Sequence, residues 1–148
     1  MDSMILADVN VLVAAYRSDH VHHAASSAWL DREINGPANF GLADRVVEGF
    51  LRVVTNRQVF SVPAPLDAAI NFAEGLRSRN NCVRVNPGQR HWDLFLEMAQ
   101  VTNAGGNSVA DAWLAALAIE SGSEWITWDM GFARYPGLKW STPALAGS

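Results

Sequence analysis

Hydrophobic and polar positions alternate with different periods along the chain and predict strands between helices. The stretch "MILAD" (residues 4–8) is a short apolar run that ends in an acid and continues into more apolar residues. This pattern predicts a buried strand that leads through a turn into a helix. The segment "EWITWD" (124–129) is predicted to be a second strand, and it also ends in an aspartate. Shorter strands are expected in "NNCVRVNPG" (80–88) and "LKW" (138–140).

Helical spacing of apolar residues accounts for most of the remaining chain. Asp44 is expected to cap the second of these helices, and Gly122 to end the last one. Strands that alternate with helices predict an α/β fold, in which helices cover both faces of a parallel sheet. Reactive groups in such folds lie at the carboxyl ends of the strands, where Asp8 and Asp129 are predicted to be. The expected helices fall in residues 23–34, 45–56, 66–79, 89–100 and 103–122.

Length and composition indicate one domain, residues 1–148, with a sizeable core. The chain has 148 residues, of which 49% are hydrophobic and 18% charged, as in globular proteins. Its single cysteine, Cys82, excludes an internal disulfide and fits a reducing cytoplasm, where we expect the protein to act. A membrane span needs about 20 apolar residues, and no stretch reaches that length without a charge.

The charge of the chain gives two opposing indications about nucleic acid. A net charge of −4 argues against a nucleic-acid partner. Ten of the 11 basic residues, however, are arginines, many of them in the middle of the chain, and arginine binds phosphate through two parallel hydrogen bonds. A genome rich in G and C also favours arginine codons, so both explanations remain open.

Four acids occupy positions where the pattern favours apolar or neutral residues: Asp8, Glu48, Asp111 and Asp129. Two carboxylates ~5 Å apart repel each other by roughly 3 kcal/mol at an effective dielectric near 20. If the four converge, either some are protonated or a cation neutralises them. Oxygen ligands select Mg²⁺ or Mn²⁺ over zinc, and such an ion can bind a phosphate and activate a water molecule. This is the chemistry of phosphodiester hydrolysis.

The sequence around these acids resembles the PIN-domain ribonucleases, in particular toxins of the VapC type from toxin–antitoxin pairs. The resemblance extends over nearly the whole chain. Its most specific parts are the Asp-x-Asn opening at Asp8–Asn10, the helix "DAWLAALA" from Asp111, and "TWDMGFARYPGL" from Thr127. Further matching stretches are "ILADVNVLVAA", "EGFLRVVTN", "GGNSVADAWLAALAIESG" and "WITWDMGFARYPGLKW".

The resemblance implies a flavodoxin-like PIN fold, a three-layer α/β/α sandwich, and a metal-dependent endoribonuclease that leaves a 5′-phosphate and a 3′-hydroxyl. Asp8 and Asp111 would hold Mg²⁺ or Mn²⁺, with Glu48 and Asp129 bound directly or through water. Asn10 and Thr127 match residues that support the acids. The implied partners are an RNA substrate, a cognate antitoxin and a second copy in a homodimer.

Two departures from the family pattern concern the site. Met130 and Gly131 stand where relatives often carry a further acid, which leaves open whether one or two ions bind. Trp113 stands where a smaller or polar residue is frequent, and it either alters substrate access or fills a hydrophobic gap.

The same residues also bear on other functions. The histidines of "HVHH" (20–23) lack the spaced partners of a zinc site and are predicted to be a surface cluster at a helix entry. A haloacid-dehalogenase phosphatase needs an acid where Asn10 stands, and both it and a response-regulator receiver need a catalytic lysine, whereas Lys139 is the only lysine. The remaining alternatives are a non-catalytic PIN-like module that binds a protein, and a PIN nuclease that acts on another nucleic acid.

Overall fold

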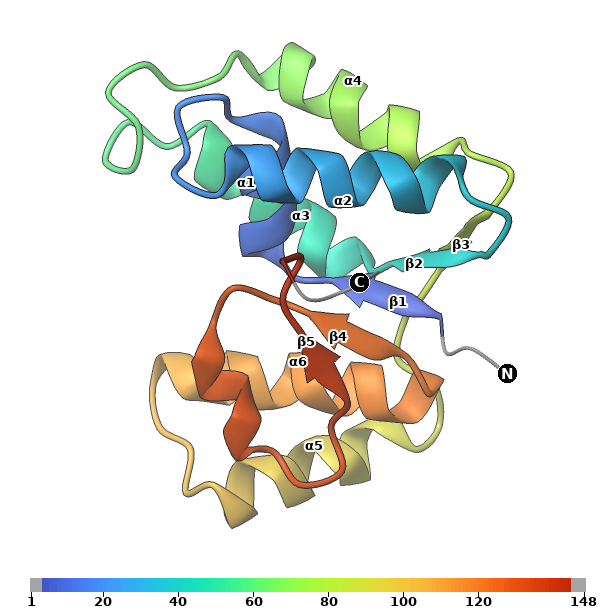
Figure 1. Cartoon of the computed structure of the whole chain (residues 1–148). Helices are drawn as coiled ribbons and strands as arrows, with labels where there is room; N and C mark the ends of the chain where they lie inside the picture. The colour runs from blue at the N-terminus through green and yellow to red at the C-terminus, as the bar shows by residue number, and fades with distance from the viewer. Residues whose placement is uncertain (1–3, 145–148) are drawn as a thin grey trace.

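A parallel sheet of five short strands forms the centre of the molecule (Figure 1). The computed structural model describes residues 4–144. The strands lie in the order β3-β2-β1-β4-β5, so that the two strands predicted to end in aspartates, β1 and β4, are neighbours. Their bounds are Ile5–Ala7 (β1), Phe40–Leu42 (β2), Cys82–Arg84 (β3), Glu124–Ile126 (β4) and Trp140–Ser141 (β5).

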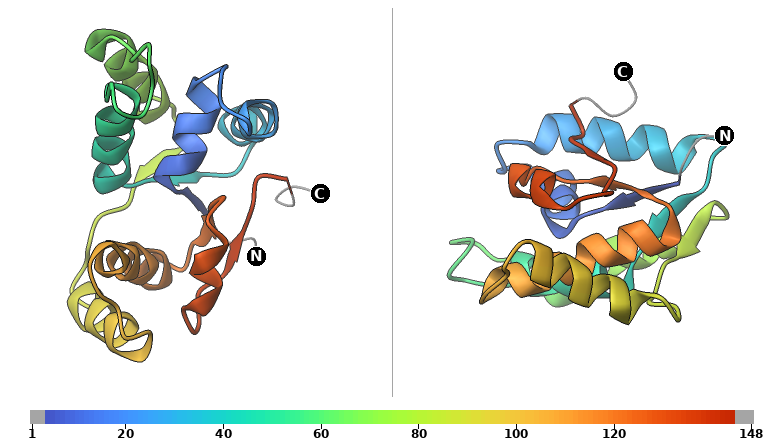
Figure 2. Two further views of the ribbon diagram at one scale, coloured as in Figure 1. Left: turned by 90° about the vertical axis from the view of Figure 1, so that its left-hand side faces the viewer. Right: turned by 90° about the horizontal axis from the view of Figure 1, so that it is seen from below.

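Helices cover both faces of the sheet, as the alternating pattern predicts. In Figures 1 and 2, α1 to α4 lie on one side of the sheet, and α5, α6 and the 3₁₀-helix η1 lie on the other. This is the expected three-layer α/β/α arrangement. No helix within residues 4–144 has the length and apolar character needed to cross a bilayer. The helices are Val9–Tyr16 (α1), His23–Asn35 (α2), Asp44–Val54 (α3), Leu66–Arg77 (α4), His91–Val101 (α5), Asn107–Ser121 (α6) and Met130–Arg134 (η1).

The core is densest around the two central strands. Leu6 of β1 and Trp125 and Ile126 of β4 are fully buried, because helices cover these strands on both faces. Phe50 of α3 and Trp29 of α2 are also fully buried and belong to the same core. This packing fixes the ends of β1 and β4, and therefore the position of the residues that follow them.

Strand β2 is absent from the sequence prediction. It has only three residues, and its middle residue is Gly41, which weakens any strand pattern. The structure explains the glycine, since a Cβ atom at Gly41 would lie 2.9 Å from a methyl group of Val85 and 3.2 Å from the carbonyl oxygen of Ile5. A close approach between neighbouring segments, which the local pattern does not reveal, therefore determines this residue.

The two predicted helix ends have different outcomes. Gly122 follows α6 with a φ of 67°, the left-handed conformation that ends helices at glycine, as expected. The prediction that Asp44 caps α3 is wrong, because Ala43 is the capping residue and no side chain bonds there. The carboxylate of Asp44 instead forms ion pairs with Arg77 and Arg84.

Candidate active site

Asp8 lies directly after β1 and is the N-terminal capping residue of α1. Its Oδ1 accepts a hydrogen bond of 2.6 Å from the backbone N–H of Val9. Only 6% of the residue is exposed. The carboxylate that interrupts the apolar N-terminal run is therefore held by the backbone at the carboxyl end of a central strand.

The second oxygen of Asp8 is held by two side chains that were predicted to support it. Thr127, fully buried just after β4, donates a hydrogen bond of 2.7 Å to Asp8 Oδ2. The amide nitrogen of Asn10 lies 3.3 Å from the same oxygen and 3.1 Å from Thr127 Oγ1. Asn10 Oδ1 accepts from the backbone N–H of Trp128 at 3.0 Å. These contacts join the end of β1 to the end of β4.

Asp129 and Asp111 complete a group of three aspartates. The backbone N–H of Asp129 donates to Thr127 Oγ1 at 3.0 Å, and its Oδ1 caps η1 by accepting from Gly131 N–H at 2.8 Å. Asp111, in α6, is half-buried and accepts from Arg134 at 3.3 Å. The negative charges of Asp111 and Asp129 both act on Asp8. The structure therefore places three of the four predicted acids around the ends of β1 and β4.

Burial and mutual repulsion raise the pKa of two of these acids. Burial, opposed by the hydrogen bonds from Thr127 and Val9 and strengthened by the charges of Asp111 and Asp129, raises the pKa of Asp8 to about 6. The pKa of Asp111 is also raised, first by burial and then by Asp129, while Arg134 lowers it. Groups whose pKa values are perturbed in this way are typical of functional sites.

The donor chemistry of this group suits a hard divalent ion. Aspartate oxygens are the ligands of Mg²⁺ and Mn²⁺, and a bound cation would oppose both the burial and the neighbouring charges that raise the pKa of Asp8. Within residues 4–144, no three acidic, histidine or cysteine side chains are close enough to hold one ion together. Mg²⁺ retains several water molecules and is commonly bound through one or two carboxylates, so the chemistry of Asp8 and of Asp111, whose charges act on one another, suits such an ion without a full set of protein ligands.

Glu48 does not join the three aspartates. Its exposed carboxylate forms an ion pair of 3.0 Å with Arg52, one turn along α3, and lines a hollow between α3 and α4. The next residue, Gly49, faces α1, because a Cβ atom there would lie 2.7 Å from a methyl group of Val9. One position on a helix corresponds to a rotation of about 100°, which carries Glu48 away from Asp8.

Arg134 contacts the candidate site, although its position in the sequence does not indicate this. Its guanidinium donates to Asp111 and, at 2.9 Å, to the hydroxyl of Tyr135. A Cβ atom at Gly131 would lie 2.8 Å from Arg134 Nη1 and 3.0 Å from Asp129 Oδ1, so the glycine leaves room for this side chain. Arg134 therefore places a positive charge beside the aspartates, 23 residues from its partner in sequence.

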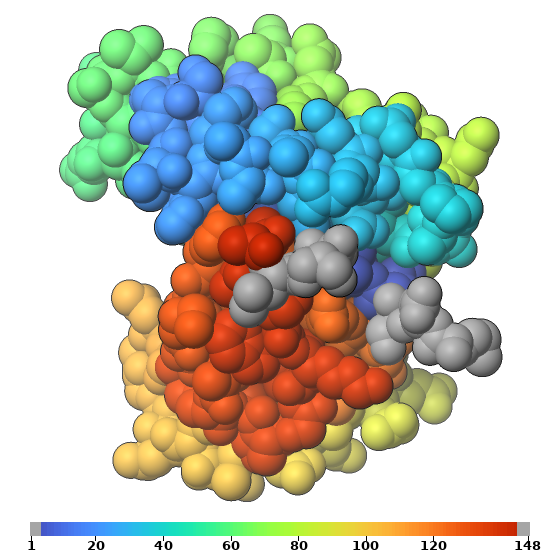
Figure 3. Space-filling model, viewed as in Figure 1, coloured from blue at the N-terminus to red at the C-terminus, as the bar shows by residue number. Residues whose placement is uncertain are grey.

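The other residues singled out in the sequence have structural partners. Trp113 packs its ring against His91 of α5, with the guanidinium of Arg45 5.4 Å from the ring centroid. The ring of His22 stacks on Trp128 with centroids 3.8 Å apart, and His23 Nδ1 lies 2.9 Å from the carbonyl oxygen of Ala14. His22 and His23 therefore contact different parts of the chain. Figure 3 shows the C-terminal part of the chain packed directly against α2 and the segment before it.

Known proteins resemble this chain in both sequence and fold. The family model described as "PIN domain" matches residues 5–138. The chain is 43% identical to the VapC ribonuclease Mb2897 of Mycobacterium bovis over 140 residues, which cover 95% of each protein.

Two of the solved structures with the same fold are complexes. VapBC2 from Rickettsia felis, bound to a DNA fragment from its promoter, has a TM-score of 0.68 at 14% identity, over 94% of this chain and 98% of that one. A toxin–antitoxin complex from Klebsiella pneumoniae has a TM-score of 0.59 at 18% identity, over 94% and 97%.

Proposed function

Because the chain belongs to the PIN-domain family, we propose that it is an endoribonuclease that hydrolyses RNA phosphodiester bonds with a divalent metal ion, Mg²⁺ or Mn²⁺. The observation that carries this proposal is the group formed by Asp8, Asp111 and Asp129. These residues come from three distant parts of the chain, and burial together with mutual repulsion raises the pKa of Asp8 to about 6. A protein keeps such an unfavourable group where a cation or a reaction uses it.

The residues of the chain have distinct roles in the proposed reaction. Asp8 and Asp111 would bind the ion, which supplies charge to stabilise phosphate oxygens and makes a water molecule a better nucleophile. Thr127 and Asn10 hold Asp8 Oδ2 in place, and the Val9 N–H holds Oδ1. With a pKa of about 6, Asp8 is mostly ionised at pH 7 and so available to a cation.

The surroundings of Asp129 favour a role in the proposed reaction, whereas those of Glu48 do not. Asp129 lies close enough for its charge to act on both Asp8 and Asp111, so it would complete the ion's surroundings through water. Glu48, paired with Arg52, would need to leave that ion pair and change rotamer to take part. We therefore place the reaction on the three aspartates and leave Glu48 outside it.

We further propose that the protein is the toxin of a toxin–antitoxin pair. The relative at 43% identity carries the name VapC ribonuclease, and a protein of the same fold was solved as a toxin–antitoxin complex. The proposed partners are a cognate antitoxin and a second copy of the chain in a homodimer, and the proposed location is the cytoplasm.

The test is a cleavage assay on purified protein freed of any bound partner. A panel of structured and single-stranded RNAs is incubated with Mg²⁺, Mn²⁺ or EDTA, beside an Asp8→Asn variant. Metal-dependent cleavage by the wild type alone would support the proposal. If wild type and variant behave alike on every RNA, and calorimetry detects no binding of Mn²⁺, the chain acts instead as a protein-binding module. Cleavage of DNA but not of RNA would show that the substrate is DNA.

A further inference from the structure

A hollow of about 390 Å³ opens beside Asp8, between α1, α3 and the segment that joins α3 to α4. Asp8 and Asn10 form one wall, so the hollow is continuous with the proposed active site. Most of the remaining surface is hydrocarbon, although the hollow lies next to a carboxylate. Its apolar side chains include Val13 of α1, Val53 of α3, and Val59 and Phe60 of the joining segment.

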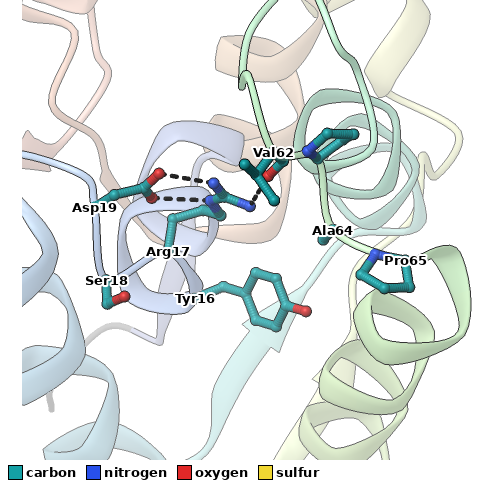
Figure 4. Close-up of a pocket in the computed structure, with 8 residues that line it drawn as sticks. Tyr16, Arg17, Ser18, Asp19, Val62, Ala64 and Pro65 are labelled. Atoms are coloured by element: carbon teal, nitrogen blue, oxygen red, sulfur yellow. Dashed lines mark hydrogen bonds and ion pairs between the residues drawn. The ribbon is translucent and has the colours of Figure 1, made fainter.

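The outer wall of this hollow is fixed by Arg17. The guanidinium of Arg17 donates to both carboxylate oxygens of Asp19, at 2.9 and 2.7 Å, and to the carbonyl oxygen of Val62 at 2.9 Å (Figure 4). The same group lies 4.1 Å from the ring centroid of Phe60. Since Arg17 follows α1, these contacts tie the joining segment to the helix that starts at Asp8. The hollow is therefore formed before any ligand enters, as in most small-molecule sites.

His20 adds one directed polar group to the apolar lining. Its Nδ1 accepts from the backbone N–H of His22 at 3.0 Å, so the neutral ring carries its proton on Nε2. Burial and the neighbouring His22, opposed by the charge of Asp19 and aided by His23, lower the pKa of His20, so the ring is mostly neutral at pH 7. Within residues 4–144, Nε2 has no hydrogen-bond partner, and the side chain lines the hollow. It can donate to an acceptor on a ligand.

We propose that this hollow binds one unstacked base of single-stranded RNA, next to the phosphate that the aspartates would hold. The inference rests on the proposed ribonuclease function and names its substrate more closely. Apolar side chains suit the faces of a base, and His20 Nε2 suits an acceptor on its edge. A phosphate is disfavoured in the hollow itself, because Asp8 contributes negative charge and no arginine or lysine lines it. A base paired in a helix could not enter, so the hollow selects single strands.

The experiment fills the hollow and compares the effect with a matched change outside it. Val53→Phe adds a ring to the lining, and Val59→Phe does so from a residue that is 53% exposed and carries little of the core. Val62→Phe is the control, because Val62 is 74% exposed and lines a different hollow, the one shown in Figure 4. Thermal unfolding of all three variants checks that each of them folds.

Binding is measured by fluorescence anisotropy on a labelled single-stranded RNA, with Ca²⁺ in place of Mg²⁺ to slow cleavage. We expect Val53→Phe and Val59→Phe to weaken binding at least about tenfold, the scale of one base contact, and Val62→Phe to change it less than twofold. A series of RNAs that each lack one base should show a single position where the wild type loses affinity and Val59→Phe loses nothing more.

The outcomes separate this inference from the proposed function. Equal RNA binding by the two filled variants and Val62→Phe overturns the base site, whether or not the wild type cuts RNA with Mn²⁺; a hollow that serves a partner protein would give this result. A wild type that binds no RNA also overturns it. If filling the hollow weakens binding but no RNA is cut, the base site stands and the nuclease proposal fails.

Discussion

Asp8 and Glu48 are both acids that the sequence places in the site, yet they have opposite surroundings. Asp8 is buried, caps a helix and accepts hydrogen bonds at both oxygens. Glu48 is exposed and has Arg52 as its partner. Asp8 follows the end of a central strand, whose position is fixed by backbone pairing with its neighbours. The direction of the Glu48 side chain depends instead on the rotation of α3 about its axis. For this pair of acids, the strand end therefore determines the position of the side chain more closely than the helix does.

Neutralising each acid in turn tests this contrast most strongly. Asp8→Asn should lower the rate of RNA cleavage by about 10³-fold or more, because it removes a charge that would hold the ion. Glu48→Gln should change the rate less than about threefold, since it removes only an exposed ion pair. Single-turnover rates with Mn²⁺ measure both. If Glu48→Gln lowers the cleavage rate as much as Asp8→Asn does, Glu48 takes part in the reaction together with the three aspartates.

The raised pKa of Asp8 predicts an inverted dependence of stability on pH. In the folded protein without metal, Asp8 keeps its proton up to about pH 6, whereas in the unfolded chain it loses it near its ordinary value of 3.8. Folding therefore binds a proton in this range, and the free energy of unfolding falls as pH rises from about 4 to 7, by up to about 3 kcal/mol from this group.

Urea unfolding in EDTA, compared between wild type and Asp8→Asn, isolates this contribution. The difference in stability between the two proteins should grow from pH 4 to pH 7 in favour of the variant. In the wild type, Mn²⁺ should bind more tightly as pH rises through about 6, because the ion competes with the proton. A difference that is independent of pH would contradict the raised pKa of Asp8.

Removing the link between the two strand ends should have the next largest effect. Thr127→Val keeps the shape of the buried side chain but deletes the donor to Asp8 and the acceptor for Asp129 N–H. We expect a loss of about 1–3 kcal/mol in the free energy of unfolding, measured in urea. Thr102→Val is the control, because the hydroxyl of Thr102, which directly follows α5, donates to the carbonyl oxygen of Met98 one turn earlier, and its loss should stay below about 1 kcal/mol. If the two variants lose the same free energy of unfolding, the hydrogen bonds of Thr127 between the two strand ends stabilise the fold no more than a local bond does.

The smallest expected change concerns Arg134. Arg134→Gln removes the positive charge that pairs with Asp111, so Mn²⁺ should bind up to about fivefold more tightly, the range of a partly exposed ion pair. Titration calorimetry at pH 7 measures the affinity, and Arg90→Gln, in which the charge of a residue outside the site is removed, controls for net charge. Weaker binding in Arg134→Gln would show that the arginine organises the aspartates instead of competing with the ion.

Much of the fold follows from local patterns, but the parts that depend on distant contacts do not. The apolar runs before Asp8 and Asp129 predict β1 and β4, and Gly122 predicts the end of α6 because its φ of 67° favours glycine. Strand β2 was missed because Gly41 is determined by its closeness to Val85, not by the residues beside it.

The site shows the same division. The strand pattern indicates Asp8, whereas only the family resemblance indicates Asn10 and Thr127. The hydrogen bonds that Thr127 forms with Asn10 and Asp8 span 117 and 119 positions of sequence, which no local pattern contains. Arg134 has no spacing that relates it to Asp111, and His20 belongs to a cluster whose pattern indicated only a surface. Their places depend on how α6, η1 and the end of α1 meet in three dimensions.

The span between Asp8 and Thr127 also affects the order of events during synthesis. A ribosome adds Thr127 119 residues after Asp8, which takes about 6 to 24 s at typical bacterial rates. During that interval Asp8 lacks Thr127, Asp111 is added late, and the acids cannot gather. Any activity that needs the three aspartates together is thus withheld from the growing chain until β4 has paired with β1.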